Sequence, residues 1–259
     1  MKRARVAYAG AVHTAFEHPQ GSDPMFQRIR LADGRVLAED QVVWLPPVEV
    51  GSVIALGLNY ADHVKELAKE LSATSQDEPL VFFKGPGALI GHQGHTRRPA
   101  GVAFMHYECE LAVVIGKTAR RVKRAEAMQH VAGYAVCNDY AVRDYLENGY
   151  RPNLRVKNRD GATVLGPWFV DAADVPDPQA LALRTSVNGQ VTQQGNTANM
   201  VNDVASLIEY LSAFMTLQAG DVILTGTPDG VVNVDVGDEV ITEIDGIGRL
   251  VNTIVADES

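Results

Sequence analysis

Short apolar runs that end at turn residues recur along the chain, and they constrain its fold more than any other feature. Four of these runs have the length and the near-continuous apolar character of buried strands: residues 53–58, 80–83, 111–115 and 131–140. They do not alternate regularly with helical segments, which argues against a Rossmann sheet. We therefore expect an α+β fold that is rich in strands.

Two segments have the apolar spacing of amphipathic helices. Residues 202–217 place their apolar side chains on one side of a helix, and Asn202 is the expected N-cap. Residues 60–71 have similar spacing. Beyond the first of these helices the pattern returns to strands, expected at 221–224, 239–244 and 250–255, with Asp245-Gly246 as a hairpin turn.

The first fifty residues contain short strand-like pieces that are separated by turn signals such as Asp33-Gly34. The pieces are residues 6–12, 26–31, 35–37 and 42–44. Pro46-Pro47 then interrupts the pattern. We expect a small β-rich N-terminal subdomain over residues 1–50 and a larger catalytic domain over residues 51–259.

Charge and composition exclude several classes of protein. A net charge of -9 argues against nucleic acid as a partner, because phosphates require a positive surface. The sequence has neither an apolar run of membrane-spanning length nor a secretory signal at its N-terminus. Both cysteines, Cys109 and Cys137, lie in apolar runs, so we expect them to be reduced core residues of a cytoplasmic protein.

Three acidic residues form the most informative chemical pattern. Glu108 and Glu110 flank Cys109 at the start of an apolar strand, so both carboxylates point to one face of that strand. Asp139 ends the strand predicted over 131–140 and is the expected third ligand. Oxygen ligands favour magnesium, calcium or manganese, and three of them leave coordination positions open for substrate. The alternative is that the two glutamates lie on a solvated strand face.

Other polar residues are candidates for substrate binding or proton transfer. His63 and Glu66 are three residues apart on the predicted helix 60–71, so they share a face, where they could move a proton or form an ordinary charged surface. Lys157 and Asp160 could anchor an anionic substrate or belong to a polar loop. The segment 225–230 joins two strands, and its hydroxyl and N–H groups could hold a carboxylate or form a plain turn.

Four segments together resemble the fumarylacetoacetate hydrolase family in their order and spacing. They are residues 57–63 (GLNYADH), residues 107–116 (YECELAVVIG), Arg143-Asp144 and residues 225–228 (TGTP). The resemblance extends from about residue 50 to the C-terminus. It implies a mixed β-roll or sandwich with a few flanking helices, Mg²⁺ or Mn²⁺ on Glu108, Glu110 and Asp139, and a homodimer.

The same resemblance implies roles for the remaining candidates. Lys157 is expected to act in catalysis, together with His63 and Glu66 on a segment that closes over the site. The resemblance also places Arg143 and Thr227 at the substrate. With Asn59 of the first motif and the loop residue Asp160, these are the expected substrate-binding residues.

Residues 137–157 resemble one subgroup of the family, which decarboxylates and isomerises unsaturated 2-oxo acids in 4-hydroxyphenylacetate (homoprotocatechuate) breakdown through a metal-stabilised dienolate. Leu146 stands where many hydrolases and oxaloacetate decarboxylases of the family have glutamine. The bifunctional form has two homologous halves, of which this sequence resembles the C-terminal one, so a homologous second chain is a possible partner. The alternatives are a C–C hydrolase of acylpyruvate or fumarylacetoacetate type, an oxaloacetate decarboxylase, and a noncatalytic binding protein for small acids.

Overall fold

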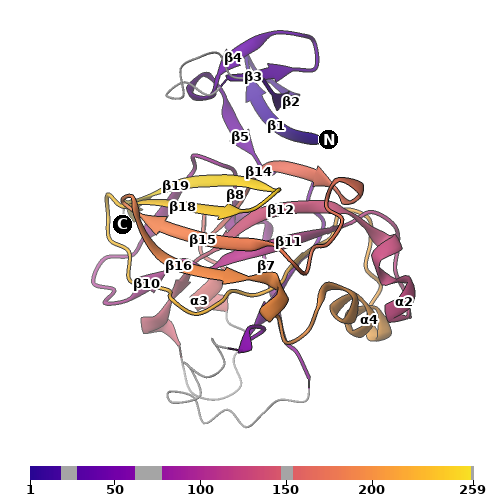
Figure 1. Cartoon of the computed structure of the whole chain (residues 1–259). Coiled ribbons are helices and arrows are strands. Elements are labelled where there is room, and N and C mark those ends of the chain that lie inside the picture. The colour runs from indigo at the N-terminus through magenta and orange to yellow at the C-terminus, as the bar shows by residue number, and fades with distance from the viewer. Residues whose placement is uncertain (19–27, 62–77, 147–153, 258–259) are drawn as a thin grey trace.

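The computed structural model describes residues 1–18, 28–61, 78–146 and 154–257, and its main elements are one large mixed sheet and a smaller second sheet (Figure 1). The strands on the path of the large sheet are, in spatial order, β4 (Val36–Ala38), β3 (Arg28–Leu31), β2 (Ala11–Glu17), β1 (Lys2–Tyr8), β14 (Thr163–Asp171), β12 (Val131–Asp139), β11 (Cys109–Ile115), β17 (Val222–Leu224), β6 (Val53–Gly57) and β7 (Leu80–Lys84). Two more strands join this sheet, β5 (Val43–Leu45) beside β1 and β8 (Leu89–Ile90) beside β14. The prediction of a β-rich fold is confirmed.

The second sheet lies against the central strands of the first. Its strands are, in spatial order, β16 (Gln190–Asn196), β15 (Ala182–Val187), β18 (Glu239–Ile244), β19 (Gly248–Ala256) and β9 (His95–Arg98). Strands β18 and β19 both contact β12 and each other. A two-stranded ribbon of β10 (Met105–His106) and β13 (Ala141–Val142) completes the strands.

Strand β11 is buried on both faces, as its continuous apolar run predicts. Since neighbouring strand residues point to opposite faces, Leu111 and Val113 join the main core with Leu250 of the second sheet. Ala112 and Val114 enter a second cluster on the other face, with partners from β12, β14 and β17. Every residue of β11 is buried, so the register of this strand is strongly specified.

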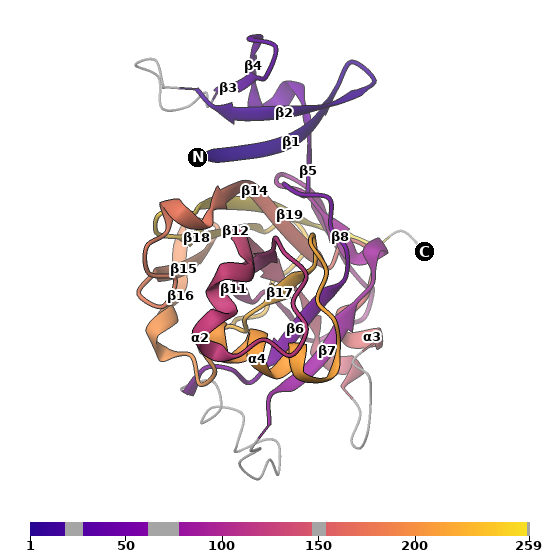
Figure 2. The same ribbon diagram turned by 90° about the vertical axis from the view of Figure 1, so that its right-hand side faces the viewer.

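The N-terminal strands form a layer at one end of the molecule (Figures 1 and 2). They continue the large sheet, because Lys2 and Arg3 of β1 pair with β14. The prediction of a single strand over residues 6–12 is wrong. Ala9 and Gly10 both have positive φ and turn the chain between β1 and β2, at a point that the apolar pattern does not mark. The domain boundary near residue 50 stays a prediction.

Helix α4 (Val204–Phe214) confirms the predicted helix but not its ends. Asp203, and not Asn202, is the N-cap, because its side chain accepts a hydrogen bond from Ser206 N. Asn202 instead donates its backbone and side-chain N–H groups to Asn59. The helix ends at Phe214 because Met215 is extended and Leu217 bridges to Ala119.

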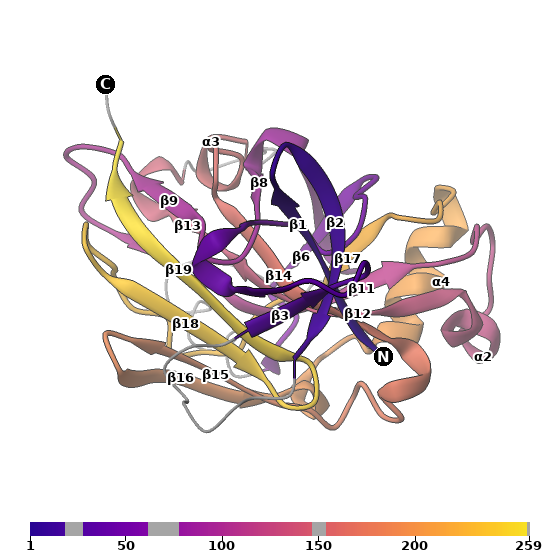
Figure 3. The same cartoon turned by 90° about the horizontal axis from the view of Figure 1, so that it is seen from above.

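The remaining elements are two short helices, the C-terminal strands that were predicted, and three strands that were not. The helices α2 (Arg124–Ala127) and α3 (Leu154–Lys157) have one turn each. In Figure 3, α2 and α4 lie at one end of the molecule, whereas α3 and β13 lie at the other. The three C-terminal strands and the turn at Asp245-Gly246 confirm the prediction. Strands β14, β15 and β16 were not predicted from the sequence. Within the described residues, no helix has the length and apolar character needed to cross a membrane.

Gly133 in β12 provides a test of the packing between β12 and β14. A Cβ atom there would lie 2.1 Å from Val170 O and 2.6 Å from Phe169 Cζ. We expect Gly133→Ala to lower the free energy of unfolding by about 1–3 kcal/mol, the cost of overpacking a core. Gly87→Ala is the matched control, since its Cβ atom would meet Asp160 at 3.5 Å, an ordinary contact. Urea denaturation checks both, and equal stabilities would contradict the tight packing.

Candidate active site

The pairing of β11 with β12 brings the three acidic residues together. Glu110 lies opposite Cys137, and Asp139 N donates to Glu108 O at 2.9 Å. Alternation along each strand then points Glu108, Glu110 and Asp139 to the same face. Each offers a carboxylate oxygen within 4.8 Å of the other two. We call these three residues the acidic cluster. It lies at the end of β11 that is nearer to β10 and β13.

Two buried lysines neutralise part of the acidic cluster. Lys157 Nζ is 2.5 Å from Glu108 Oε2 and 3.1 Å from Asp139 Oδ2. Lys84 Nζ forms an ion pair with Asp139 Oδ1, and both of these side chains are fully buried. Burial by itself lowers the pKa of Lys157, but the three carboxylates raise it above its ordinary value. Lys157 is therefore a fixed positive charge in this arrangement.

Glu110 forms no ion pair with a lysine of the described residues and is the least satisfied member of the acidic cluster. Its side chain is buried, and Oε2 accepts a hydrogen bond from Gly226 N at 2.6 Å. Oε1 has no hydrogen-bond partner among the described residues. Burial, followed by repulsion from Asp139 and Glu108, raises the pKa of Glu110 well above its ordinary value. A divalent cation would supply both the missing partner and the missing charge, so the residues present fit a metal site.

Gly226 can approach Glu110 because it has no side chain. Its φ is +87°, and a Cβ atom would lie 2.9 Å from Asn59 Cβ and 3.3 Å from Leu56 O. Asn59 holds this loop in place, since its buried amide donates to Thr225 O at 2.8 Å and to Asn202 O at 3.0 Å. Asn59 thus acts on the loop in this structure, and its contact with substrate stays a prediction.

The other predicted substrate residues lie at different distances from the acidic cluster. Arg143 Nε donates to His106 Nε2 at 2.7 Å, and His106 Nδ1 is 3.7 Å from Glu108 Oε1. Thr227, two residues from Asn59's partner Thr225, is buried and accepts a hydrogen bond from Gln193 Nε2 at 2.9 Å. Arg143 is therefore linked to the acidic cluster through His106, whereas the Thr227 hydroxyl already has a hydrogen bond to Gln193.

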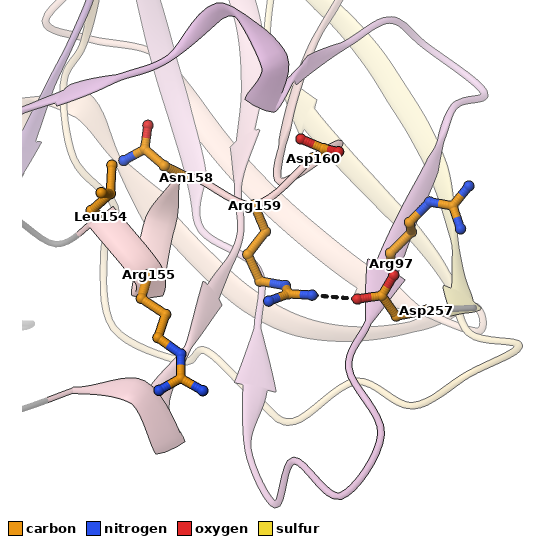
Figure 4. A pocket seen from close by; sticks show the side chains of 7 residues that line it. All are labelled: Arg97, Leu154, Arg155, Asn158, Arg159, Asp160 and Asp257. Atoms are coloured by element: carbon orange, nitrogen blue, oxygen red, sulfur yellow. Dashed lines mark hydrogen bonds and ion pairs between the residues drawn. The ribbon is translucent and has the colours of Figure 1, made fainter. Parts of the chain in front are cut away.

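Asp160 is exposed and lines a different hollow of the surface. It lines a polar cavity of about 540 Å³. Figure 4 shows Asp160 there with Arg159, which is paired with Asp257. The cavity also takes residues from α3 and its flank, and no member of the acidic cluster lines it. His63 and Glu66 lie outside the described residues, so their roles stay predictions.

Lys84 and His106 belong to the site but were not predicted from the sequence. Lys84 lies two residues after Phe82 in β7 and therefore shares its buried face. A lysine on a buried strand face is rarely without a charged partner, and this was a signal available in the sequence. His106 lies just before the acidic pattern, but only the fold brings it to Arg143.

Comparison with known proteins extends this description. The family model for the C-terminal part of fumarylacetoacetate hydrolase matches residues 52–255. A relative from Salmonella dublin, the 4-hydroxyphenylacetate degradation bifunctional isomerase/decarboxylase, is 58% identical over 222 residues, which are 86% of this chain and 51% of that protein. The chain thus spans about half the length of the curated relative it matches.

Two solved structures cover more of their own length. The 2-hydroxyhepta-2,4-diene-1,7-dioate isomerase from Mycobacterium marinum has a TM-score of 0.83 and 34% identity, with all of both chains covered. The fumarylpyruvate hydrolase from Pseudomonas aeruginosa, solved with Mn²⁺ and pyruvate, has a TM-score of 0.73 and 30% identity over 85% of this chain and 93% of that one. The family match, the identities and the fold agree: the chain belongs to the fumarylacetoacetate hydrolase family.

Proposed function

We propose that the chain is a divalent-metal-dependent decarboxylase and isomerase of an unsaturated 2-oxo dicarboxylic or tricarboxylic acid in 4-hydroxyphenylacetate breakdown. The observation that carries the proposal is the acidic cluster, in which Glu110 and Asp139 are buried and Glu110 Oε1 has no partner among the described residues. The names of the isomerase/decarboxylase and isomerase relatives support the choice of reaction. Mg²⁺ or Mn²⁺ is the proposed metal, held by Glu108, Glu110 and Asp139.

In the proposed reaction, negative charge develops on the 2-oxo oxygen of the substrate, and the positive charge of Lys157 would stabilise it. Loss of CO₂ leaves an electron pair that spreads through the conjugated chain to the 2-oxo oxygen, and a later proton on carbon gives the isomerised product. A bound divalent cation supplies Lewis-acid stabilisation of that oxygen. Lys157, held charged by its carboxylate partners, adds positive charge beside it. We assign the proton transfer to His63, oriented by Glu66, and the binding of substrate carboxylate to Arg143.

The rival with a specific observation in its favour is a C–C hydrolase, since one structural relative is a fumarylpyruvate hydrolase. Hydrolysis consumes water, whereas decarboxylation and isomerisation do not. Turnover in water labelled with oxygen-18 separates them, because only hydrolysis places the label in a product carboxylate.

We further propose a homodimer in the cytoplasm, with a homologous chain as the alternative partner. Analytical ultracentrifugation reports which assembly forms.

Removal of one metal ligand tests the proposed function directly. We expect Glu108→Gln to abolish Mg²⁺-dependent turnover of an unsaturated 2-oxo dicarboxylate, followed by absorbance and CO₂ release. Asp139→Ala is expected to abolish turnover too. It is the weaker test, because Lys84 would lose its buried partner and the free energy of unfolding would fall. Glu49→Gln is the control, since that side chain is 90% exposed. Full turnover by EDTA-treated wild type would refute the metal dependence.

The raised pKa of Glu110 predicts that metal binding releases a proton. A carboxyl whose pKa is raised keeps its proton above the ordinary range of glutamate, and Mg²⁺ must displace that proton. The apparent affinity for Mg²⁺ therefore rises with pH, up to the pKa of Glu110 in the metal-free protein. Calorimetry in two buffers of different ionisation enthalpy measures the release. In Glu110→Gln, measured at Mg²⁺ concentrations high enough to load the weakened site, we expect the release per bound Mg²⁺ to disappear, and its persistence there would assign the proton to another group.

His63→Gln tests the proton carrier separately from metal binding. We expect turnover to fall by roughly two to four orders of magnitude, the range for loss of a general acid–base. The affinities for Mg²⁺ and for oxalate, which mimics the planar enolate of a 2-oxo acid, should stay near wild type. Exchange of the substrate's allylic protons with deuterated solvent, followed by NMR, should fall with turnover. His95→Gln, an exposed residue on β9, is the control. Survival of both rates would move the base elsewhere.

A further inference from the structure

His106 is a fully buried histidine that the proposed reaction does not yet use. It pairs with Ala141 across the β10–β13 ribbon, and its side chain has no exposed surface. Both ring nitrogens have partners: Nδ1 lies 3.1 Å from Tyr107 O, and Nε2 accepts the hydrogen bond from Arg143 Nε at 2.7 Å. The ring that satisfies both contacts is neutral, with its proton on Nδ1.

Arg143 is held from two sides, by its backbone and by its Nε. Its backbone N donates to Phe104 O at 2.9 Å, at the start of the short helix η4 (Arg143–Tyr145). The next residue, Asp144, accepts from Ala103 N at 2.7 Å and from Phe104 N at 2.8 Å. These contacts join η4 to the segment that leads into β10, so the start of the Arg143 side chain has a defined position.

The terminal N–H donors of the Arg143 guanidinium are available to a ligand. A guanidinium has five N–H donors in a planar fork that matches a carboxylate in two-point contact. One of the five is used by His106, and no hydrogen bond joins the terminal Nη groups to the part of the chain that the structure describes. The side chain is half-buried, so the fork has lost part of its hydration. An anionic ligand would complete it.

The position of this fork relative to the acidic cluster suggests which anion. The His106 ring lies between the two: its Nε2 is 2.7 Å from Arg143 Nε, and its Nδ1 is 3.7 Å from Glu108 Oε1, a contact too long for a hydrogen bond. A 2-oxo acid that uses its first carboxylate at the acidic cluster extends the rest of its chain from there. A second carboxylate on that chain would fit the fork of Arg143.

We propose that His106 is a positioning residue, which holds Arg143 through the Nε2···H–Nε hydrogen bond so that the terminal guanidinium groups bind the second carboxylate of a dicarboxylic substrate. The inference rests on the proposed function, because it assumes a 2-oxo acid at the acidic cluster. It adds to that function a selection for substrates with two carboxylates. A neutral acceptor at this position keeps the fork oriented without neutralising it, which an acidic residue would do.

Binding of two matched ligands to the Mg²⁺-loaded full chain tests this inference. 2-Oxoheptanedioate carries a second carboxylate that 2-oxoheptanoate lacks, and oxalate reports the metal site alone. In His106→Leu we expect the Kd of the dicarboxylate to rise about tenfold to a hundredfold, the range for losing a charge-assisted hydrogen-bonded contact. The Kd values of 2-oxoheptanoate and oxalate should remain within about threefold of wild type. In His106→Gln, whose amide oxygen can accept from Arg143 Nε, the dicarboxylate affinity should be largely restored.

A double-mutant cycle shows whether His106 acts through Arg143. Arg143→Lys should weaken the dicarboxylate by a similar factor, and adding His106→Leu to it should have no further effect. Additive losses would overturn the inference, as would equal losses for all three ligands, since His106 would then support Glu108 or the fold. Should His106→Leu fail to fold, the comparison of His106→Gln with Arg143→Lys decides: restored selectivity in the first and lost selectivity in the second are expected, and the reverse would overturn the inference.

The failure of this inference is distinguishable from the failure of the proposed function. If the wild type turns over the unsaturated dicarboxylate but binds 2-oxoheptanedioate no more tightly than 2-oxoheptanoate, only the role of His106 and Arg143 is wrong. If the wild type distinguishes the two ligands in the expected way but turns over no unsaturated 2-oxo acid, only the proposed reaction is wrong.

Discussion

Three carboxylates gathered on one face of β11 and β12, with Glu110 and Asp139 buried and Glu108 partly buried, are the constraint on which the rest of the site depends. Isolated buried charges are costly, so each must be paired, protonated or bound to a cation. Asp139 meets this demand with Lys84 and Lys157, and Glu108 with Lys157. Glu110 has one backbone hydrogen bond and a raised pKa. A divalent cation would neutralise the carboxylate charge that the two lysines do not pair with. The cluster therefore supports a metal-dependent reaction.

The rigidity of the site follows from the strands that carry it. β11 is buried on both faces and paired on both edges, with β12 and β17, so a shift of its register would turn Glu110 into the main core. The loop after β17 brings Gly226 to Glu110, and Asn59 fixes that loop from the end of β6. Elements that are distant in the sequence thus hold each carboxylate in one orientation, and this preorganisation favours both metal binding and catalysis.

Predictions were most accurate where the pattern is local and the strand is central. The runs at 53–58, 111–115 and 131–140 became β6, β11 and β12, and residues 239–244 became β18 with the predicted bounds. They were wrong where a turn lacks a clear marker, as at Ala9-Gly10 in the predicted strand 6–12. The N-cap of α4 moved to Asp203 because Asn202 is engaged by Asn59, a contact between residues 143 positions apart that no local pattern records.

The sequence by itself determined that the fold is rich in strands and that Glu108 and Glu110 share a face, because strand periodicity depends only on neighbouring residues. The sequence also identified the family, because the order and spacing of the motifs can be recognised without any knowledge of the fold. Only the tertiary structure decided that Lys84 pairs with Asp139, that Gly226 reaches Glu110, and that His106 meets Arg143. These contacts join separate strands and loops, and their partners are chosen by the pairing and packing of whole sheets, which local sequence does not encode.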